Sequence, residues 1–296
     1  MRIADQQLFG LLQGRFQQIS QRILLAQQQI ASQKEVSRPS DDPNTFGQII
    51  SDKSDLSRAE QRIRNVEFGA SRLDAADSAL ATVNQVLSRI KELAVQARSD
   101  TATASDRSLI AKEVRELHRQ LVQVANTEVN GTSIFAGTKT DLAPFVLGPG
   151  DTVQYQGNAE TQSVEVGNGQ RIQITVPGNV IFTGPSMNLF DGLRDLLASL
   201  ESNNGTGIET GIGDVDRALV QVAGTQGTIG ALANRLESTQ RSLDDVSDLI
   251  KAALSRHEDA DLAKAISDLT GQQLALEATA RSANRLFENS LLNFLK

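Results

Sequence analysis

The stretch that decides the fold is residues 262–287, LAKAISDLTGQQLALEATARSANRLF. Apolar or small residues recur there in alternating steps of four and three, with one glutamine among them: Leu262, Ile266, Leu269, Gln273, Leu276, Ala280, Ala283 and Phe287. This is the spacing of a coiled-coil seam. Near the other terminus a second stripe has the same spacing: Phe9, Leu12, Phe16, Ile19, Ile23, Ala26 and Ile30. A helix cannot bury such a stripe alone, so the two termini are predicted to pack together or against other subunits.

The composition excludes several classes of protein. Only 4% of the 296 residues are aromatic while 39% are hydrophobic, which favours thin helical layers over a large globular core. Without cysteine there is no disulfide and no thiolate chemistry. The formal net charge of −7 disfavours nucleic acid and anionic membranes as partners. The first residues lack the apolar run of a secretory signal, and no run reaches the ~18 apolar residues of a membrane span, so we expect no membrane insertion.

The first part of the chain is predicted to be three long helices. The first runs over about 5–35 and ends before Pro39, which forces the preceding residue out of helical angles. The second starts at Pro43 behind a capping Ser40, Asp41 or Asp42, and continues to about residue 98. The third starts near residue 105 and ends before the Asn-Gly pair at 130–131, a strong stop signal.

The middle of the chain changes character. Residues 131–230 hold 17 of the 22 glycines and 4 of the 6 prolines, and apolar residues alternate with polar ones between turn signals. This predicts a small antiparallel sheet over about 132–185, a short amphipathic helix over 189–200, and a glycine-containing loop near 205–213. Helix follows almost to the end, with a break near Asp259 where the heptad register is interrupted.

We therefore predict a mainly helical α+β fold, an elongated bundle of long terminal coiled-coil helices with a small inserted antiparallel β domain. Its predicted parts are an N-terminal helical half over 1–131, an outward-facing insertion over 132–185, and a C-terminal helical half over 186–296 that packs on the first. The insertion and its flank carry much of the negative charge, which is most simply a solvated surface.

A search for catalytic or metal-binding residues finds little. The two histidines, His118 and His257, lie far apart in the sequence and no zinc-binding spacing occurs, so neither a metal nor a cofactor is predicted. The acidic pair 41–42 and the acidic cluster 258–261 each stand at a predicted helix start, where a carboxylate caps free N–H groups. Capping is the favoured explanation for both, and the sequence predicts a protein that is not an enzyme.

Three motifs identify a resemblance. The turn Ser37-Arg38-Pro39-Ser40-Asp41-Asp42-Pro43 resembles the turn after the first helix in the flagellin superfamily, and looks most like its hook-associated protein 3 branch. The segment 130–137, NGTSIFAG, is similar to the family motif after the third helix, and the ending 289–295, NSLLNFL, also fits. The resemblance covers roughly residues 1–140 and 225–296.

The resemblance implies a structural subunit of the bacterial flagellum, located outside the cell after type III export without a cleaved signal peptide. Such a subunit self-assembles through its terminal helices and forms the junction between the hook-side junction protein and the flagellin filament. A cytoplasmic export chaperone would engage its C-terminal helices. Two alternatives remain open at this point: a flagellin filament subunit, and a type III secreted helical translocator.

The expected assembly interface is the set of large apolar residues of the two terminal stripes: Phe9, Leu12, Phe16, Ile19, Ile23, Ile30, Leu262, Ile266, Leu269, Leu276 and Phe287. The family turn, Arg38, Pro39, Ser40, Asp41, Asp42 and Pro43, is the second expected site.

Overall fold

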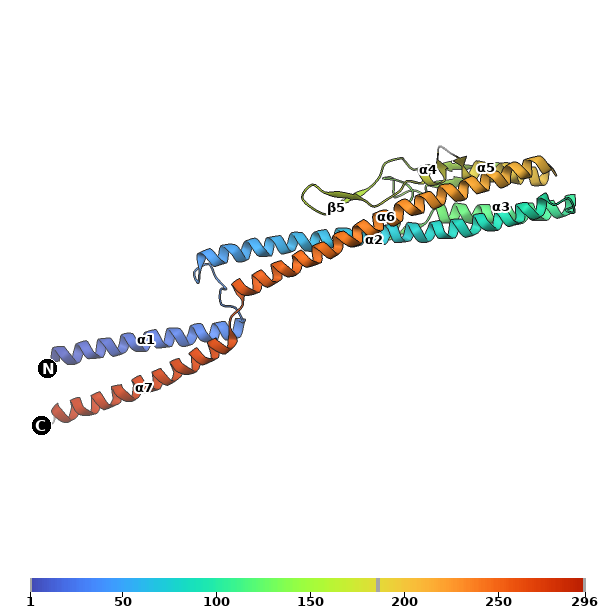
Figure 1. Ribbon diagram of the computed structural model, residues 1–296. Helices are drawn as coiled ribbons and strands as arrows, with labels where there is room; N and C mark the ends of the chain where they lie inside the picture. Colours follow the sequence, from blue (N-terminus) through green and yellow to red (C-terminus); the bar gives the residue numbers. More distant parts are fainter. Residues whose placement is uncertain (1, 185–186, 295–296) are drawn as a thin grey trace. The chain divides into compact units, whose positions relative to one another are not determined.

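Figure 1 shows the computed structural model, which describes residues 2–184 and 187–294. The chain forms two compact units, residues 1–58 with 246–296 and residues 59–245. The division falls inside two long helices, α2 (Pro43–Arg98) and α6 (Gly205–Glu258). The predicted parts 1–131, 132–185 and 186–296 follow the order of elements along the chain, and they remain a prediction.

The first unit contains the helices of both termini. Helix α1 (Arg2–Ser32) packs antiparallel against α7 (Leu262–Phe294), so the start of α1 and the end of α7 lie at the same end of the pair (Figure 1). The first helix was expected to reach residue 35, but it ends at Ser32. The reason is that Gln33 adopts a left-handed backbone conformation with φ of 59°, which ends an α-helix.

Helix α2 has the predicted bounds, because local signals define both of its ends. Asp42 accepts hydrogen bonds from the main-chain N–H groups of Asn44 and Thr45 at 3.0 and 3.2 Å, and Pro43 occupies the first helical position. Apolar or small residues recur at heptad spacing along α2, and they are buried or half-buried throughout: Leu56, Ala59, Ile63, Val66, Ala70, Leu73, Leu80 and Leu87. The heptad spacing therefore identified the inward face of this helix correctly.

In the second unit α2 is accompanied by α3 (Ala104–Ala125), α5 (Leu189–Glu201) and α6. Thr103 and Asp106 cap α3 reciprocally, and the side chain of Asn188 caps α5. Helices α3 and α5 pack against each other through apolar faces, and the leucines of α5 are buried as the sequence predicted. The described residues contain no helix long and apolar enough to cross a membrane.

The middle of the chain forms four separate antiparallel strand pairs instead of the single small sheet that alternation suggested. They are β1 (Glu128–Val129) with β2 (Thr132–Ser133), β3 (Phe145–Leu147) with β4 (Val153–Tyr155), β5 (Ser163–Glu165) with β6 (Arg171–Gln173), and β7 (Thr183–Gly184) with β8 (Met187–Asn188). A 3₁₀ turn (Pro149–Asp151) and a short helix α4 (Gly178–Ile181) lie between them. Asn130 and Gly131 both have positive φ, as a two-residue hairpin turn requires.

An aromatic cluster joins these strand pairs to the helices. Phe135, Phe145, Phe182 and Phe190 are all fully buried, and their rings meet at centroid distances of 5.1 to 5.7 Å. Gly69 of α2 lies against Ile174 of the inserted segment, because a Cβ at Gly69 would be 2.5 Å from Cγ2 of Ile174. Helix α2 and the insertion therefore approach closely at this position. The insertion is thus part of the core of the second unit.

One predicted loop is wrong. The glycines at 205, 207, 211 and 213 belong to the first turns of α6, although glycine disfavours helix. Tertiary contact explains two of them: a Cβ at Gly211 would lie 2.7 Å from Cδ1 of Leu196, and one at Gly207 would lie 2.3 Å from Oγ of Ser199. Close packing of α6 on α5 therefore overrides the local preference.

Candidate assembly surface on the terminal helices

The pairing of α1 with α7 buries one stripe on each helix. On α1 the predicted positions Leu12, Phe16, Ile19, Ile23 and Ile30 are half-buried and Ala26 is buried. On α7 the positions that are buried or half-buried in the same steps are Ala265, Leu269, Gln272, Leu276, Thr279 and Ala283. Phe9 and Phe287 belong to the two helices, but their side chains lie outside the described residues.

The stripe on α7 differs from the predicted one near its start. Leu262, Ile266 and Gln273 are exposed, whereas the small Ala265 is buried at 6% exposure. In this turn of α7 the alanine is therefore the residue that is buried, and the two large apolar residues are exposed. Leu262 and Ile266, two members of the expected assembly interface, are therefore exposed in this chain, and their role in assembly remains a prediction.

A second set of apolar side chains on this pair faces solvent. Its members share high exposure in the isolated chain, and they are Leu11, Leu24 and Leu25 on α1 and Leu262, Ile266 and Leu274 on α7. We call this set the outer apolar face, although at about 100° per residue its members lie at several angles around each helix, outside the buried stripe. Isolated exposed leucines are ordinary, but several on two paired helices favour a contact with another protein.

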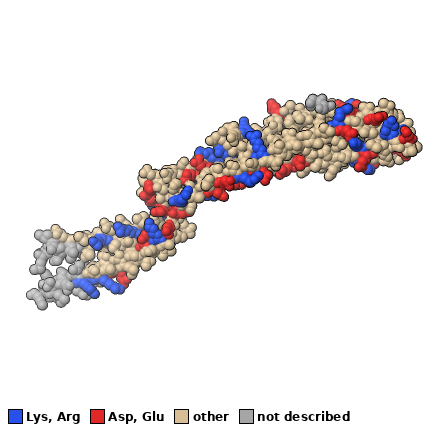
Figure 2. Space-filling model, in the orientation of Figure 1, with Lys and Arg blue, Asp and Glu red and all other residues tan. Residues whose placement is uncertain are grey.

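Helix α1 also carries very few charges. Between Gln7 and Ser32 its only charged residues are Arg15 and Arg22, whereas eight residues of this stretch are glutamine. Figure 2 accordingly shows the surface of the α1–α7 pair mostly in tan, with a few blue and red atoms. A neighbour could cover such a surface without burying many unpaired charges, which are costly to remove from water.

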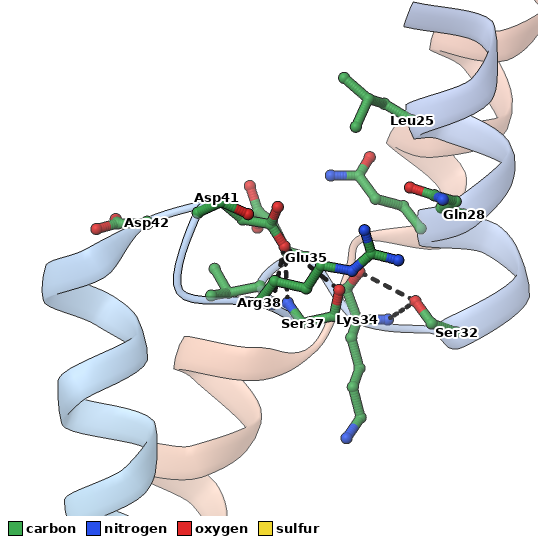
Figure 3. Close-up of a pocket in the computed structure, with 12 residues that line it drawn as sticks. Leu25, Gln28, Ser32, Lys34, Glu35, Ser37, Arg38, Asp41 and Asp42 are labelled. Carbon is green, nitrogen blue, oxygen red and sulfur yellow. Dashed lines mark hydrogen bonds between the residues drawn. The ribbon is translucent and has the colours of Figure 1, made fainter. Parts of the chain in front are cut away.

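The family turn lies between α1 and α2, and its two aspartates have separate structural tasks (Figure 3). The Asp41 carboxylate accepts hydrogen bonds from the main-chain N–H groups of Ser37 and Arg38 at 3.1 and 3.0 Å, which lower the pKa of Asp41. The pKa of Asp42 is lowered by the Thr45 hydroxyl, which donates at 2.7 Å, and by the N–H groups at the start of α2. Asp42 therefore caps α2 as predicted, whereas Asp41 binds N–H groups of the connection before α2 and does not cap a helix.

Beside this turn lies a hollow of about 540 Å³ lined by the last turns of α1 and by the connection to α2. Figure 3 shows Leu25 and Gln28 on one side of it and Arg38 and Asp41 on the other. Acidic, basic and hydroxyl side chains of the turn therefore line the same hollow as Leu25, a member of the outer apolar face.

The acidic residues 258–261 lie beside the connection between α1 and α2. All of them were predicted to cap a helix start, and this prediction needs a correction for Glu258. Asp261 does cap α7, through the N–H of Lys264 at 3.1 Å, and Asp259 accepts from the Ser255 hydroxyl at 2.6 Å. Glu258 has another task. As the last residue of α6 it is 7% exposed, and its Oε1 binds both Lys34 and Lys53, the latter at 2.8 Å. Sequence gave no signal for this contact, because these partners are more than 200 residues away.

Burial of Glu258 raises the pKa of its carboxyl, but hydrogen bonds from Lys34 and Lys53 outweigh this and the pKa is lowered. The Glu258 carboxyl is therefore ionised at neutral pH. Glu258, Lys34 and Lys53 are called the Glu258 cluster below. Main-chain contacts surround it: the N–H of Glu35 donates to O of Glu258 at 2.8 Å, and the N–H of Ala260 donates to O of Gln33 at 3.0 Å.

The two histidines do not come together in a site. His118 is fully buried in the second unit, with its ring edge-on to Phe190, and burial lowers the pKa of its imidazole. His257 lies in the first unit, where its Nδ1 is 3.1 Å from Oδ2 of Asp52. Across residues 2–184 and 187–294 no group of three acidic or histidine side chains is arranged to hold a metal ion.

Comparison with known proteins agrees with this description. The chain is 26% identical over 290 residues to flagellar hook-associated protein 3 of Escherichia coli, covering 91% of this chain and 92% of the relative. It is 28% identical over 282 residues to flagellin of Bacillus subtilis, covering 89% and 90%. These relatives are structural flagellar proteins, which confirms the prediction of a protein that is not an enzyme.

A solved structure shows the same fold. The putative flagellar hook-associated protein from Vibrio parahaemolyticus superposes with a TM-score of 0.69 at 20% identity, covering 74% of this chain and all of that one. The family model for the bacterial flagellin N-terminal helical region matches residues 11–140, and the one for the C-terminal helical region matches residues 212–295. Together with the motifs of the turn and of residues 130–137, these matches show that the chain belongs to the flagellin superfamily, with the fold of its hook-associated protein 3 branch.

Proposed function

We propose that this structural flagellar protein is the adaptor between the hook-side junction protein and the flagellin filament. The observation that carries the proposal is the outer apolar face on α1 and α7, in a chain that resembles hook-associated protein 3 over nine-tenths of its length. The terminal helices would be covered by equivalent helices of neighbouring copies and by the two different partners at either side of the junction.

The proposed interface combines the outer apolar face with the terminal stripes. The stripes hold α1 on α7 within one chain, and the outer face is available to a neighbour. The hollow beside the family turn would receive a side chain of that neighbour next to Leu25. Export to the outside of the cell, with a cytoplasmic chaperone on the C-terminal helices, completes the proposal, and the insertion over 132–185 would point away from these contacts.

A growth experiment tests the adaptor role. Isolated hooks that carry the hook-side junction protein are incubated with purified flagellin, with this protein, or with both, and filaments are counted by electron microscopy. An adaptor gives filaments only when both proteins are present. Filaments on hooks that received flagellin alone would contradict the proposal.

A second function, a flagellin filament subunit, is favoured by the match to Bacillus subtilis flagellin at 28% identity over most of both chains. The same experiment separates the two functions. Long filaments grown from this protein alone, without added flagellin, would establish the filament subunit and overturn the adaptor.

A further inference from the structure

The stripes that join α1 and α7 do not by themselves determine how the helices align. Read along the chain, both stripes advance in steps of four and three: Leu12, Phe16, Ile19, Ile23, Ala26 and Ile30 on α1, and Ala265, Leu269, Gln272, Leu276, Thr279 and Ala283 on α7. Because both patterns repeat every seven residues, sliding α1 by seven residues again places one stripe on the other. Large side chains could fix one alignment, but five of these twelve positions are alanine, threonine or glutamine.

The connections allow α1, but not α7, to slide. Helix α7 follows α6 after only three residues, 259–261, whereas α1 is joined to α2 by the ten residues 33–42. A slip of seven residues moves a helix by about 10 Å along its axis. An extended ten-residue connection spans roughly 33 Å, so the chain length does not prevent this slip.

The Glu258 cluster holds this connection at one place. Lys34 belongs to the connection, Lys53 to α2 and Glu258 to the end of α6, so one carboxylate ties three segments together. The N–H of Glu35 and the carbonyl of Gln33 form main-chain hydrogen bonds to Glu258 and Ala260, and Lys34 and Asp259 form an isolated antiparallel bridge. A slip of α1 would have to break all of these contacts.

We propose that the Glu258 cluster positions α1, by selecting a single register of α1 on α7. The register of α1 on α7 decides which side chains of the two helices form the outer apolar face. Only the importance of this face for assembly rests on the proposed function. The neighbouring contact of His257 with Asp52 joins α6 to α2 without touching the connection. It therefore cannot select the register, although it lies beside the cluster.

Spin labels in the full-length monomer test the proposal, and the chain suits them because it has no cysteine. Cysteines replace Gln27 on α1 and Ser267 on α7, which are both exposed and close to the connection. The parent chain should give one narrow distance by pulsed electron resonance. Glu258→Gln should add a second population, displaced along the helices by about 10 Å. Asp52→Asn is the matched control, and it should keep the single distance.

Two further measurements separate register from general loosening. Amide exchange of the peptide that covers residues 33–36 should become about ten- to a hundredfold faster in Glu258→Gln and stay unchanged in Asp52→Asn. The charge-exchanged triple variant, Lys34→Glu, Lys53→Glu and Glu258→Lys, should restore the single distance. A single unchanged distance in Glu258→Gln, or general broadening without a second population, would overturn the proposal. Because all of these readouts use the monomer, they do not depend on the outcome of the hook experiment.

Discussion

Replacing Leu24 on the outer apolar face should separate assembly from folding. The Leu24 side chain is 58% exposed in the isolated chain, whereas its neighbour Ile23 is half-buried in the contact between α1 and α7. Exposed substitutions of this kind usually change the free energy of unfolding by less than about 0.5 kcal/mol. Leu24→Ala and Leu24→Asp should therefore give a monomer with normal helix content and normal melting temperature.

The substitutions at Leu24 should weaken binding only when a neighbouring subunit covers this side chain. Full burial of a leucine is worth about 1.5–3 kcal/mol, so covering the exposed 58% contributes roughly 0.9–1.7 kcal/mol per subunit. Leu24→Ala loses most of this, which weakens each contact roughly 5- to 20-fold. Leu24→Asp in addition buries an unpaired carboxylate at a cost of several kcal/mol, and the loss should exceed about a hundredfold.

The assay is the concentration of each variant needed for half-maximal filament growth on isolated hooks with excess flagellin. Ile23→Asp is the informative comparison, because it should also loosen the monomer and speed amide exchange in α1. If Leu24→Asp supports filament growth at the concentration that the parent chain needs, the outer apolar face is not an assembly surface.

Three more predictions concern the second unit. Burial lowers the pKa of His118 below its ordinary value of about 6.5, so below that pH the unfolded chain binds a proton that the folded chain does not. The melting temperature should therefore fall as the pH drops below about 6.5, and His118→Phe should make this fall smaller. Gly211→Ala should lower the free energy of unfolding, measured with urea, by about 1–3 kcal/mol because its Cβ would meet α5. Gly213→Ala, which has open space around it, should raise that free energy by about 0.4–1 kcal/mol. Equal effects of the two substitutions would contradict the close contact at Gly211. Glu160→Gln with Glu165→Gln should leave secretion and filament number on cells unchanged, and loss of filaments despite normal secretion would mean that the insertion makes subunit contacts.

Helix ends with local causes could be read from the sequence. Pro43 behind Asp42, and Asn130 with Gly131, act through their own backbone and nearest neighbours, so the bounds of α2 and the stop after α3 could be predicted without tertiary information. The motif-based family assignment was equally local. It required only residues that stand close together in the chain.

Features that depend on distant contacts could not be read in this way. The helix across Gly211 forms because α5 lies within reach of a bare backbone, and propensity alone argues for a loop. Near Ala265 the heptad pattern admits two alignments one residue apart, and periodicity alone does not say which of them faces α1. The contact of Lys34 with Glu258 joins residues 224 positions apart, for which single-sequence periodicity contains no signal.

The scarcity of charge on α1 has a consequence for the conditions under which the protein associates. Surfaces that attract each other through ion pairs lose affinity as salt screens them, over a Debye length of about 10 Å at 0.1 M. Between Gln7 and Ser32 the helix has only Arg15 and Arg22 to be screened, while its leucines and glutamines are indifferent to ionic strength. Contacts made through α1 should accordingly persist from low to high ionic strength, which would keep a flagellar structural subunit assembled when the salt concentration around it changes.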